Sequence, residues 1–333
     1  MLYWVMKTEE SVPAVMVAAN AHRMRQWLSL TMQQKRRVLQ SAFFALFLTA
    51  PALNVFRFDL NETQLWVLGQ RWSLGIDGFI RGNATATQTA LHIIVWGIVP
   101  LLTGVVIFLS VAYRYGRLYC GWLCPHFSAV EILNDLLHRA CGKLSIWDAS
   151  ATIQKDQTPK VIWWPVFVVT SCMFAFLWSI TLLTYLLPPS EIWGNFLHAQ
   201  LTLNQTRFLV VGTVVLTLEF TLARHLFCRF GCAVGLFQSL VWMANDKGLV
   251  MAFDRQRAKE CKTCDAPLGS ACDRVCPMRL SPRNIKRMMF SCVQCGKCTS
   301  ACDASQAIQK RTASLTWVTG LDAVRENLRQ KVH

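Results

Sequence analysis

Residues 90–112 read ALHIIVWGIVPLLTGVVIFLSVA, and the chain then continues through Arg117-Leu-Tyr-Cys120-Gly-Trp-Leu-Cys124-Pro125. The first stretch contains no Asp, Glu, Lys or Arg. It is long enough to cross a bilayer as a helix, which takes about 20 apolar residues. The second stretch places two cysteines four positions apart, directly beyond that helix. Together the two stretches predict a membrane span that ends in a pair of thiols.

The same arrangement occurs a second time in the chain. Residues 208–226 form another apolar run, which leads into Cys228 and Cys232. Each C-x3-C motif is followed by an amphipathic stretch, at 127–137 and at 234–243. Two parallel copies of one unit, a helical hairpin that ends in C-x3-C, explain this pattern most simply.

Two further apolar runs, at 38–56 and 161–187, bring the number of candidate spans to four. The loops between the spans differ in basic residues: 57–89 has three and 188–204 has none, whereas 113–160 has six. Cytoplasmic loops are usually the ones rich in Lys and Arg. We therefore expect a multi-pass protein of a bacterial inner membrane, with both termini and the middle loop in the cytoplasm.

The composition agrees with a membrane protein. Hydrophobic residues make up 53% of the 333 residues and charged residues only 16%, whereas soluble domains usually carry about 25% charged residues. The net charge of +15 does not indicate a nucleic-acid partner, because the basic residues flank the apolar runs. We expect an all-α polytopic protein with about four transmembrane helices and two repeated hairpins.

A second cysteine pattern lies near the C-terminus. Cys292, Cys295, Cys298 and Cys302 are spaced C-x2-C-x2-C-x3-C, the spacing with which bacterial two-cluster ferredoxins ligate [4Fe–4S] clusters. Short gaps let three thiolates surround one corner of a cubane cluster. The fourth cysteine of such a run ligates the other cluster, so this run predicts a second one.

The second run is present as Cys261, Cys264, Cys272 and Cys276, and it is followed by Pro277. Its middle gap is longer than usual. Crossed ligation assigns one cluster to Cys261, Cys264, Cys272 and Cys302, and the other to Cys276, Cys292, Cys295 and Cys298. Zinc is the alternative for paired C-x2-C units, although eight cysteines in two such runs are hard to divide into zinc knuckles.

The cysteine pairs at the span ends have a less specific meaning. On a helix, Cys120 and Cys124, or Cys228 and Cys232, would share one face. They are candidates for a soft-metal site such as Cu(I), a redox-active dithiol or an electron relay, and simple packing of small residues is the alternative. Glu219 lies inside a predicted span and could accept a proton from quinol, or it could pair with a nearby basic residue.

These features resemble the membrane polyferredoxins, which include NapH, the membrane part of NosR, and the CcoG/FixG proteins. The resemblance rests on residues 119–125, on the run from Cys292 to Cys302, and on the stretch Phe253-Asp254-Arg255-Gln256-Arg257. It is closest to the core of CcoG, without that protein's C-terminal domain. The resemblance implies one-electron transfer at the membrane.

We therefore predict four parts: a cytoplasmic arm at 1–37, a membrane domain at 38–245, a ferredoxin-like domain with two clusters at 246–312, and a polar helix with a tail at 313–333. The predicted function is iron–sulfur electron transfer between quinol or a cytosolic donor and an extracytoplasmic or membrane redox partner. The alternative is a cupric reductase that helps to assemble a copper enzyme. A structural anchor, in which the clusters only hold the tail folded, is a third reading.

Overall fold

The computed structural model describes residues 30–62, 64–143, 145–147, 159–264 and 270–329. Most of the predicted N-terminal arm lies outside the described residues. Within the described ranges the chain is mostly helical, as predicted.

Three described helices are long and apolar enough to cross a membrane: Ala86–Tyr115, Trp163–Leu186 and Leu203–Ala223. The first consists of α4 (Ala86–Ile93), η1 (Ile94–Ile98) and α5 (Val99–Tyr115). The second is the single helix α8 (Trp163–Leu186), and the third consists of α10 (Leu203–Leu218) and η2 (Glu219–Ala223). The segments η1 and η2 are π-helical turns inside otherwise regular helices. Three of the four predicted spans are therefore present as membrane-length helices.

The remaining predicted span, at 38–56, corresponds to α2 (Met32–Thr49). This helix begins in a charged stretch, and Thr31 caps its N-terminus by accepting from the backbone of Gln34. Its second half runs beside α8, because the rings of Phe44 and Phe174 lie 6.0 Å apart and those of Phe47 and Trp178 lie 4.7 Å apart. The apolar half of α2 is thus level with a candidate span, although the helix as a whole is not among the membrane-length ones.

Two small sheets depart from the expected all-α fold. One is antiparallel and is formed by β1 (Phe56–Asp59), β2 (Gln64–Val67) and β3 (Gln70–Trp72). Leu68 and Gly69 join β2 to β3 and both have positive φ, 50° and 77°, which matches the right-handed twist of a tight hairpin. Such turns usually carry Asn-Gly, so Leu-Gly gave little signal in the sequence.

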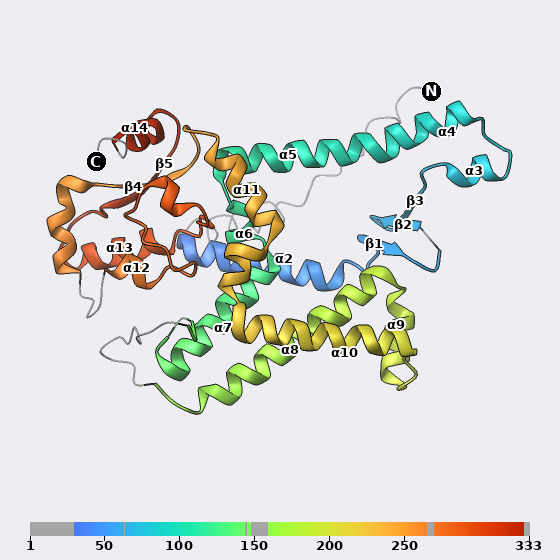
Figure 1. The fold of residues 1–333 in the computed structure, drawn as a ribbon, viewed down its shortest axis with the longest axis horizontal. Helices are drawn as coiled ribbons and strands as arrows, with labels where there is room; N and C mark the ends of the chain where they lie inside the picture. Colours follow the sequence, from blue (N-terminus) through green and yellow to red (C-terminus); the bar gives the residue numbers. More distant parts are fainter. Residues whose placement is uncertain (1–29, 63, 144, 148–158, 265–269, 330–333) are drawn as a thin grey trace, which may run out of the picture.

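The elements of the chain gather at two ends of the helical part. Figure 1 shows the sheet β1–β3, α3 (Ile76–Ile80) and α9 (Pro189–Leu197) at one end, and the cysteine-rich tail at the other. The tail is formed by short elements, listed here in order: β4 (Val250–Phe253), η4 (Arg255–Thr263), α12 (Ala271–Arg274), η5 (Lys286–Met289), α13 (Lys297–Ala307), β5 (Leu315–Val318) and α14 (Leu321–Arg329). Strands β4 and β5 pair antiparallel and form the second sheet.

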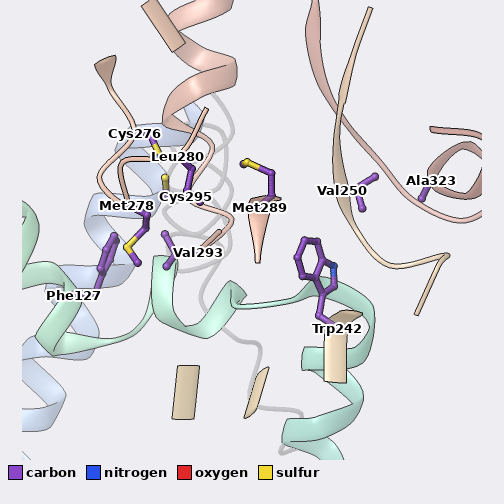
Figure 2. Packing of buried hydrophobic residues seen from close by; sticks show 10 residues of the cluster. All are labelled: Phe127, Trp242, Val250, Cys276, Met278, Leu280, Met289, Val293, Cys295 and Ala323. Carbon is purple, nitrogen blue, oxygen red and sulfur yellow. The ribbon is translucent and has the colours of Figure 1, made fainter. Parts of the chain in front are cut away.

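The span ends and the tail meet through four elements that follow the spans: α6 (Leu118–Trp122), α7 (Pro125–Cys141), η3 (Phe227–Gly231) and α11 (Ala233–Met243). Phe127 of α7 and Trp242 of α11 are each 1% exposed, and they pack in one core with tail residues Cys276, Met278 and Cys295. Figure 2 shows this core, with side chains from the span ends and from the tail pointing toward one another. The tail is therefore fixed to the membrane part by a shared hydrophobic core.

Candidate functional site

The eight tail cysteines fall into two neighbourhoods. Cys276 and Cys295 belong to the core in Figure 2, and Cys292 packs against that core. Cys272, Cys298 and Cys302 belong to a second core. Both cores contain cysteines from each of the two sequence runs, so the runs are folded together.

Electrostatic coupling gives a finer picture of these neighbourhoods. Burial, and then the neighbouring Cys295 and Cys276, raise the pKa of Cys292 to about 12, although a backbone N–H from Gln294 opposes this. Burial also raises the pKa of Cys272 to about 11, and Cys302 is among the groups that add to it. Cys276 thus acts on the second run, and Cys302 acts on the first.

This donor set fits iron–sulfur clusters. All fourteen cysteines are free thiols, and buried thiols with raised pKa values give up their protons when a metal replaces them. The backbone N–H of Leu280 donates to Cys276 Sγ at 3.4 Å, and the hydroxyl of Ser270 lies 3.1 Å from Cys272 Sγ. Such donors stabilise cluster-bound sulfur and tune cluster potentials. Bound there, clusters would supply one-electron acceptors and donors.

The loop that holds Cys295 is packed tightly on the rest of the molecule. Gly296 has φ 68°, and a Cβ at this position would overlap the methyl group of Met32 and lie 3.0 Å from Trp317. The amide of Gln33 donates to the carbonyl of Cys295 at 3.1 Å. The start of α2 and strand β5 therefore close over the predicted cluster loop, and glycine is needed for that approach.

The first membrane-edge pair does not lie on one helix, contrary to the expectation from its spacing. Cys120 is in α6, which ends at Trp122, whereas Cys124 is the N-cap residue of α7. Pro125 at the first position of α7 starts the new helix, since it lacks only an N–H that would be unpaired there. Backbone N–H groups of the first turn of α7 donate to the Cys124 thiol and oppose the rise in its pKa that burial causes.

The α6 segment sits directly on the predicted cluster loop. A Cβ at Gly121 would overlap the carbonyl oxygen of Val293 and lie 3.3 Å from the backbone nitrogen of Cys295. The indole N–H of Trp122 donates to the carbonyl of Gln294 at 2.9 Å. Consequently the first C-x3-C motif and the run from Cys292 to Cys298 form one continuous structure.

The second pair is built differently. Cys228 lies in the π-helical turn η3, and Cys232 is the N-cap residue of α11. Arg224, between η2 and η3, has φ 38° and ψ −109°, a backbone conformation that residues other than glycine rarely adopt. Two π-turns around a strained residue widen and redirect the helix, and such irregularities often mark functional sites.

A row of polar side chains links the two copies. His126 Nε2 lies 3.0 Å from Glu219 Oε2, and His126 Nδ1 lies 3.6 Å from Cys228 Sγ. The imidazole also stacks on the ring of Phe220, with centroids 5.2 Å apart. The predicted intramembrane acid is therefore held against a histidine whose other ring nitrogen faces a thiol, at the place where the repeats meet.

Arg117 lies at the centre of the cysteine pairs. Its side chain is fully buried; Nη1 donates to the carbonyl of Cys228 at 2.8 Å and Nε donates to Ser239 Oγ at 2.5 Å. Burial lowers the pKa of Arg117, whereas charge on Cys120 and its neighbours would raise it. Nη2 is buried and has no hydrogen-bond partner among the described residues. A buried cation of this kind stabilises negative charge on nearby sulfur.

Sequence reasoning missed a buried ion network. Glu131 of α7 accepts from Arg36 at 2.7 and 2.8 Å, from Gln40 at 2.8 Å and from Lys297 at 2.8 Å. Burial alone would raise the pKa of Glu131, but Arg36 and Lys297 lower it to about 2. Lys297 stands between Cys295 and Cys298 in the sequence, so the network ties α2 and α7 to the predicted cluster loop. The one signal in the sequence was Glu131 itself, an acid within the amphipathic stretch 127–137.

Comparison with known proteins gives three relatives and one family match. The 4Fe–4S binding domain family matches residues 97–143 and 203–247, and each match covers one C-x3-C motif with the helix after it. An uncharacterised protein of Methanocaldococcus jannaschii is 25% identical over 197 residues, which is 59% of this chain and 65% of that protein. A second one is 24% identical over 221 residues, 64% of this chain and 82% of that protein.

The protein YccM of Escherichia coli, whose name proposes a role in electron transport, is 20% identical over 211 residues. The match covers 61% of this chain and 53% of YccM. The chain thus spans about two thirds of the first relative's length and about half of YccM's. No solved structure matches the chain. The repeated family match and the likeness to YccM support an iron–sulfur protein with an electron-transfer role.

Proposed function

We propose that this chain carries electrons within a membrane, through two [4Fe–4S] clusters in its tail. The electrons pass between quinol or a cytosolic donor and an extracytoplasmic or membrane oxidoreductase. One cluster is held by Cys276, Cys292, Cys295 and Cys298, and the other by Cys261, Cys264, Cys272 and Cys302. The protein lies in a bacterial inner membrane with four spans, α2 being the first, and the clusters face the cytoplasm.

One observation carries this proposal: the predicted cluster loop rests directly on the first C-x3-C motif. Gly121 touches Val293, and Trp122 donates a hydrogen bond to Gln294. A cluster in this loop would lie beside the membrane surface rather than in a separate soluble domain. That position suits exchange of electrons with a partner held in or on the membrane.

The test uses the full chain in liposomes. Cluster absorbance should bleach when a quinol is added and recover with a quinone, whereas dithionite should reduce the clusters in either case. Reduction by dithionite without any response to quinol would remove quinol as the donor. A preparation that binds no iron would contradict the whole proposal.

A cupric reductase is the second candidate, and the contact between Cys228 and His126 is the observation that favours it. Thiolate and imidazole are both copper ligands. Among the residues that the structure describes, no three His, Cys, Asp or Glu side chains are arranged to hold one metal ion, either at this contact or at the tail cysteines. Stoichiometric Cu(I) binding that is lost when Cys120 and Cys228 are both replaced by Ala would favour this function over the first.

A further inference from the structure

A groove of about 340 Å³ runs between α2 and α7. Its lining changes character along its length. Apolar side chains form one part, namely Phe44, Ala45, Leu48, Ala129, Ile132 and Phe174. Polar side chains form the other part, namely Arg36, Arg37, Gln40, Ser41, Ser128, Glu131, Asp135 and Lys297. The volume is within the range of small-molecule sites, roughly 300–1,000 Å³.

The apolar part lies at the depth of a candidate span. Phe44 packs on Phe174 and Trp178, which are in the middle of α8. Ile132 is 48% exposed on the outer face of α7. In a bilayer, this side of the groove meets hydrocarbon, so an occupant can enter from the membrane.

The polar part lies beside the predicted cluster loop. Lys297, which lies between Cys295 and Cys298 in the sequence, lines the groove. Its side chain forms an ion pair with Glu131. Gln33, one turn before the groove on α2, donates to the carbonyl of Cys295. A molecule at this end would be separated from the cysteine loop by little more than one side chain.

A second hollow, of about 670 Å³, adjoins the polar part. It lies between α7 and the tail, and it shares Arg37, Glu131, Asp135 and Lys297 with the groove. Beyond these shared residues its lining is divided between polar side chains such as His138 and Arg274 and apolar ones such as Val275 and Ile308. The groove, the predicted cluster loop and this second hollow therefore meet at the same few side chains.

We propose that this groove binds a membrane quinone or quinol, with the ring at Lys297 and Asp135 and the isoprenoid chain along Phe44, Leu48 and Ile132. The inference rests on the proposed electron-transfer function and names the site of its lipophilic partner. The polar end offers donors from Arg37 and Lys297 and an acceptor from Asp135, which suits the carbonyl and hydroxyl groups of a neutral ring.

The experiment uses the full, cluster-loaded chain in nanodiscs and a short-chain photoreactive azido-quinone. Cross-linked peptides are identified by mass spectrometry. The groove-filling variant is Ala45→Trp, and its control is Ala42→Trp, which adds the same bulk on the same helix at an exposed position outside the lining. We expect labelling of α2 or α7 peptides, lowered by about tenfold or more in Ala45→Trp and unchanged in Ala42→Trp.

Iron content and the absorbance of dithionite-reduced clusters distinguish failure of the quinone site from failure of the proposed electron-transfer function. Normal clusters with labelling that persists in Ala45→Trp, or that falls on helices away from the groove, would overturn the quinone site alone. A phospholipid that co-purifies with the wild type and is lost from Ala45→Trp, without quinone labelling, would overturn it as well. Absence of clusters in the wild type would instead refute the proposed function.

Discussion

The two copies of the C-x3-C unit share a motif but differ in what they touch. In the first copy, α6 packs against the cysteine loop of the tail through Gly121 and Trp122. In the second copy, π-turns place Glu219 and Cys228 around His126, a residue of the first copy. Both copies pack on the tail, because Trp242 of α11 lies in the same core as Phe127. Only the first copy, however, lays its C-x3-C segment on the cysteine loop, whereas the second supplies polar groups to the junction between the repeats.

The two acids beside these copies differ in the same way. Glu131 accepts hydrogen bonds from Arg36, Gln40 and Lys297, which satisfy both of its oxygens. Glu219 has one oxygen on His126, and its other oxygen is buried with no hydrogen-bond partner among the described residues. A fully paired carboxylate stabilises a fold, whereas a partly paired one retains the capacity to bind a proton or a ligand. Four predictions test this contrast.

The largest effect is expected from Cys302→Ser. Under crossed ligation this change damages the cluster on Cys261, Cys264 and Cys272, and metal binding supplies about 10 kcal/mol or more of the folding free energy in small metal domains. The tail should become sensitive to proteases, and the bond from Trp122 to the tail should be lost. The contact of His126 with Glu219 should survive, since it lies within the repeats.

Mössbauer spectroscopy and limited proteolysis measure this outcome. Cys276→Ser is the matched control, because it should damage the other cluster. If Cys302→Ser perturbs only the cluster on Cys292, Cys295 and Cys298, then each run binds its own metal and crossed ligation is wrong.

Glu131→Gln is expected to lower the free energy of unfolding by about 3–5 kcal/mol, since it leaves the buried guanidinium of Arg36 without its carboxylate. Glu219 has fewer partners, and Gln has nearly the same shape, so Glu219→Gln should change the free energy of unfolding by about 1 kcal/mol or less. Thermal unfolding followed by circular dichroism measures both. Equal losses in the two variants would mean that the two acids do not differ in role.

The stability that Glu131 contributes should depend on pH with a defined sign. Its pKa is lowered from 4.5 to about 2 in the folded chain. The contribution, roughly 3 kcal/mol, is therefore fully present above about pH 4.5 and is lost as pH falls toward 2. The difference in melting temperature between wild type and Glu131→Gln should shrink over that window, and a constant difference would assign the stabilisation to packing instead.

The smallest of the four effects is expected from Gly121→Ala. The new methyl group overlaps the carbonyl of Val293, so the α6 segment must shift from the tail, at a cost of about 1–3 kcal/mol. Gly231→Ala in the second copy meets only the ring of Phe227, at 3.0 Å, which can move. Proteolysis rates of the tail compare the two. A greater effect of Gly231→Ala would reverse the assignment of roles to the copies.

Much of the helical architecture could be predicted from local pattern. The runs at 161–187 and 208–226 correspond to α8 and to the helix Leu203–Ala223. The polar helix expected within residues 313–333 is α14 (Leu321–Arg329). These features depend on hydrophobicity over neighbouring residues, which a sequence displays directly.

The site depended on relations that local pattern does not contain. Cys120 and Cys124 were expected on one helix, but α6 ends at Trp122 and a new helix, α7, begins at Pro125. The network around Glu131 joins residues as distant as Arg36 and Lys297. Only the packing of α2, α7 and the tail brings these groups together, and nothing in the local sequence pairs them.

The pairing of β4 with β5 has a consequence for the order of biosynthesis. Strand β4 precedes all eight tail cysteines in the chain and β5 follows them all. The ribosome therefore completes every cysteine before the strand that closes the tail emerges. Until β5 docks and brings Trp317 over Gly296, the cysteine loop lacks one side of its enclosure. If these cysteines hold clusters as proposed, iron and sulfide would have an interval, after the cysteines are translated and before β5 pairs with β4, in which to reach the loop.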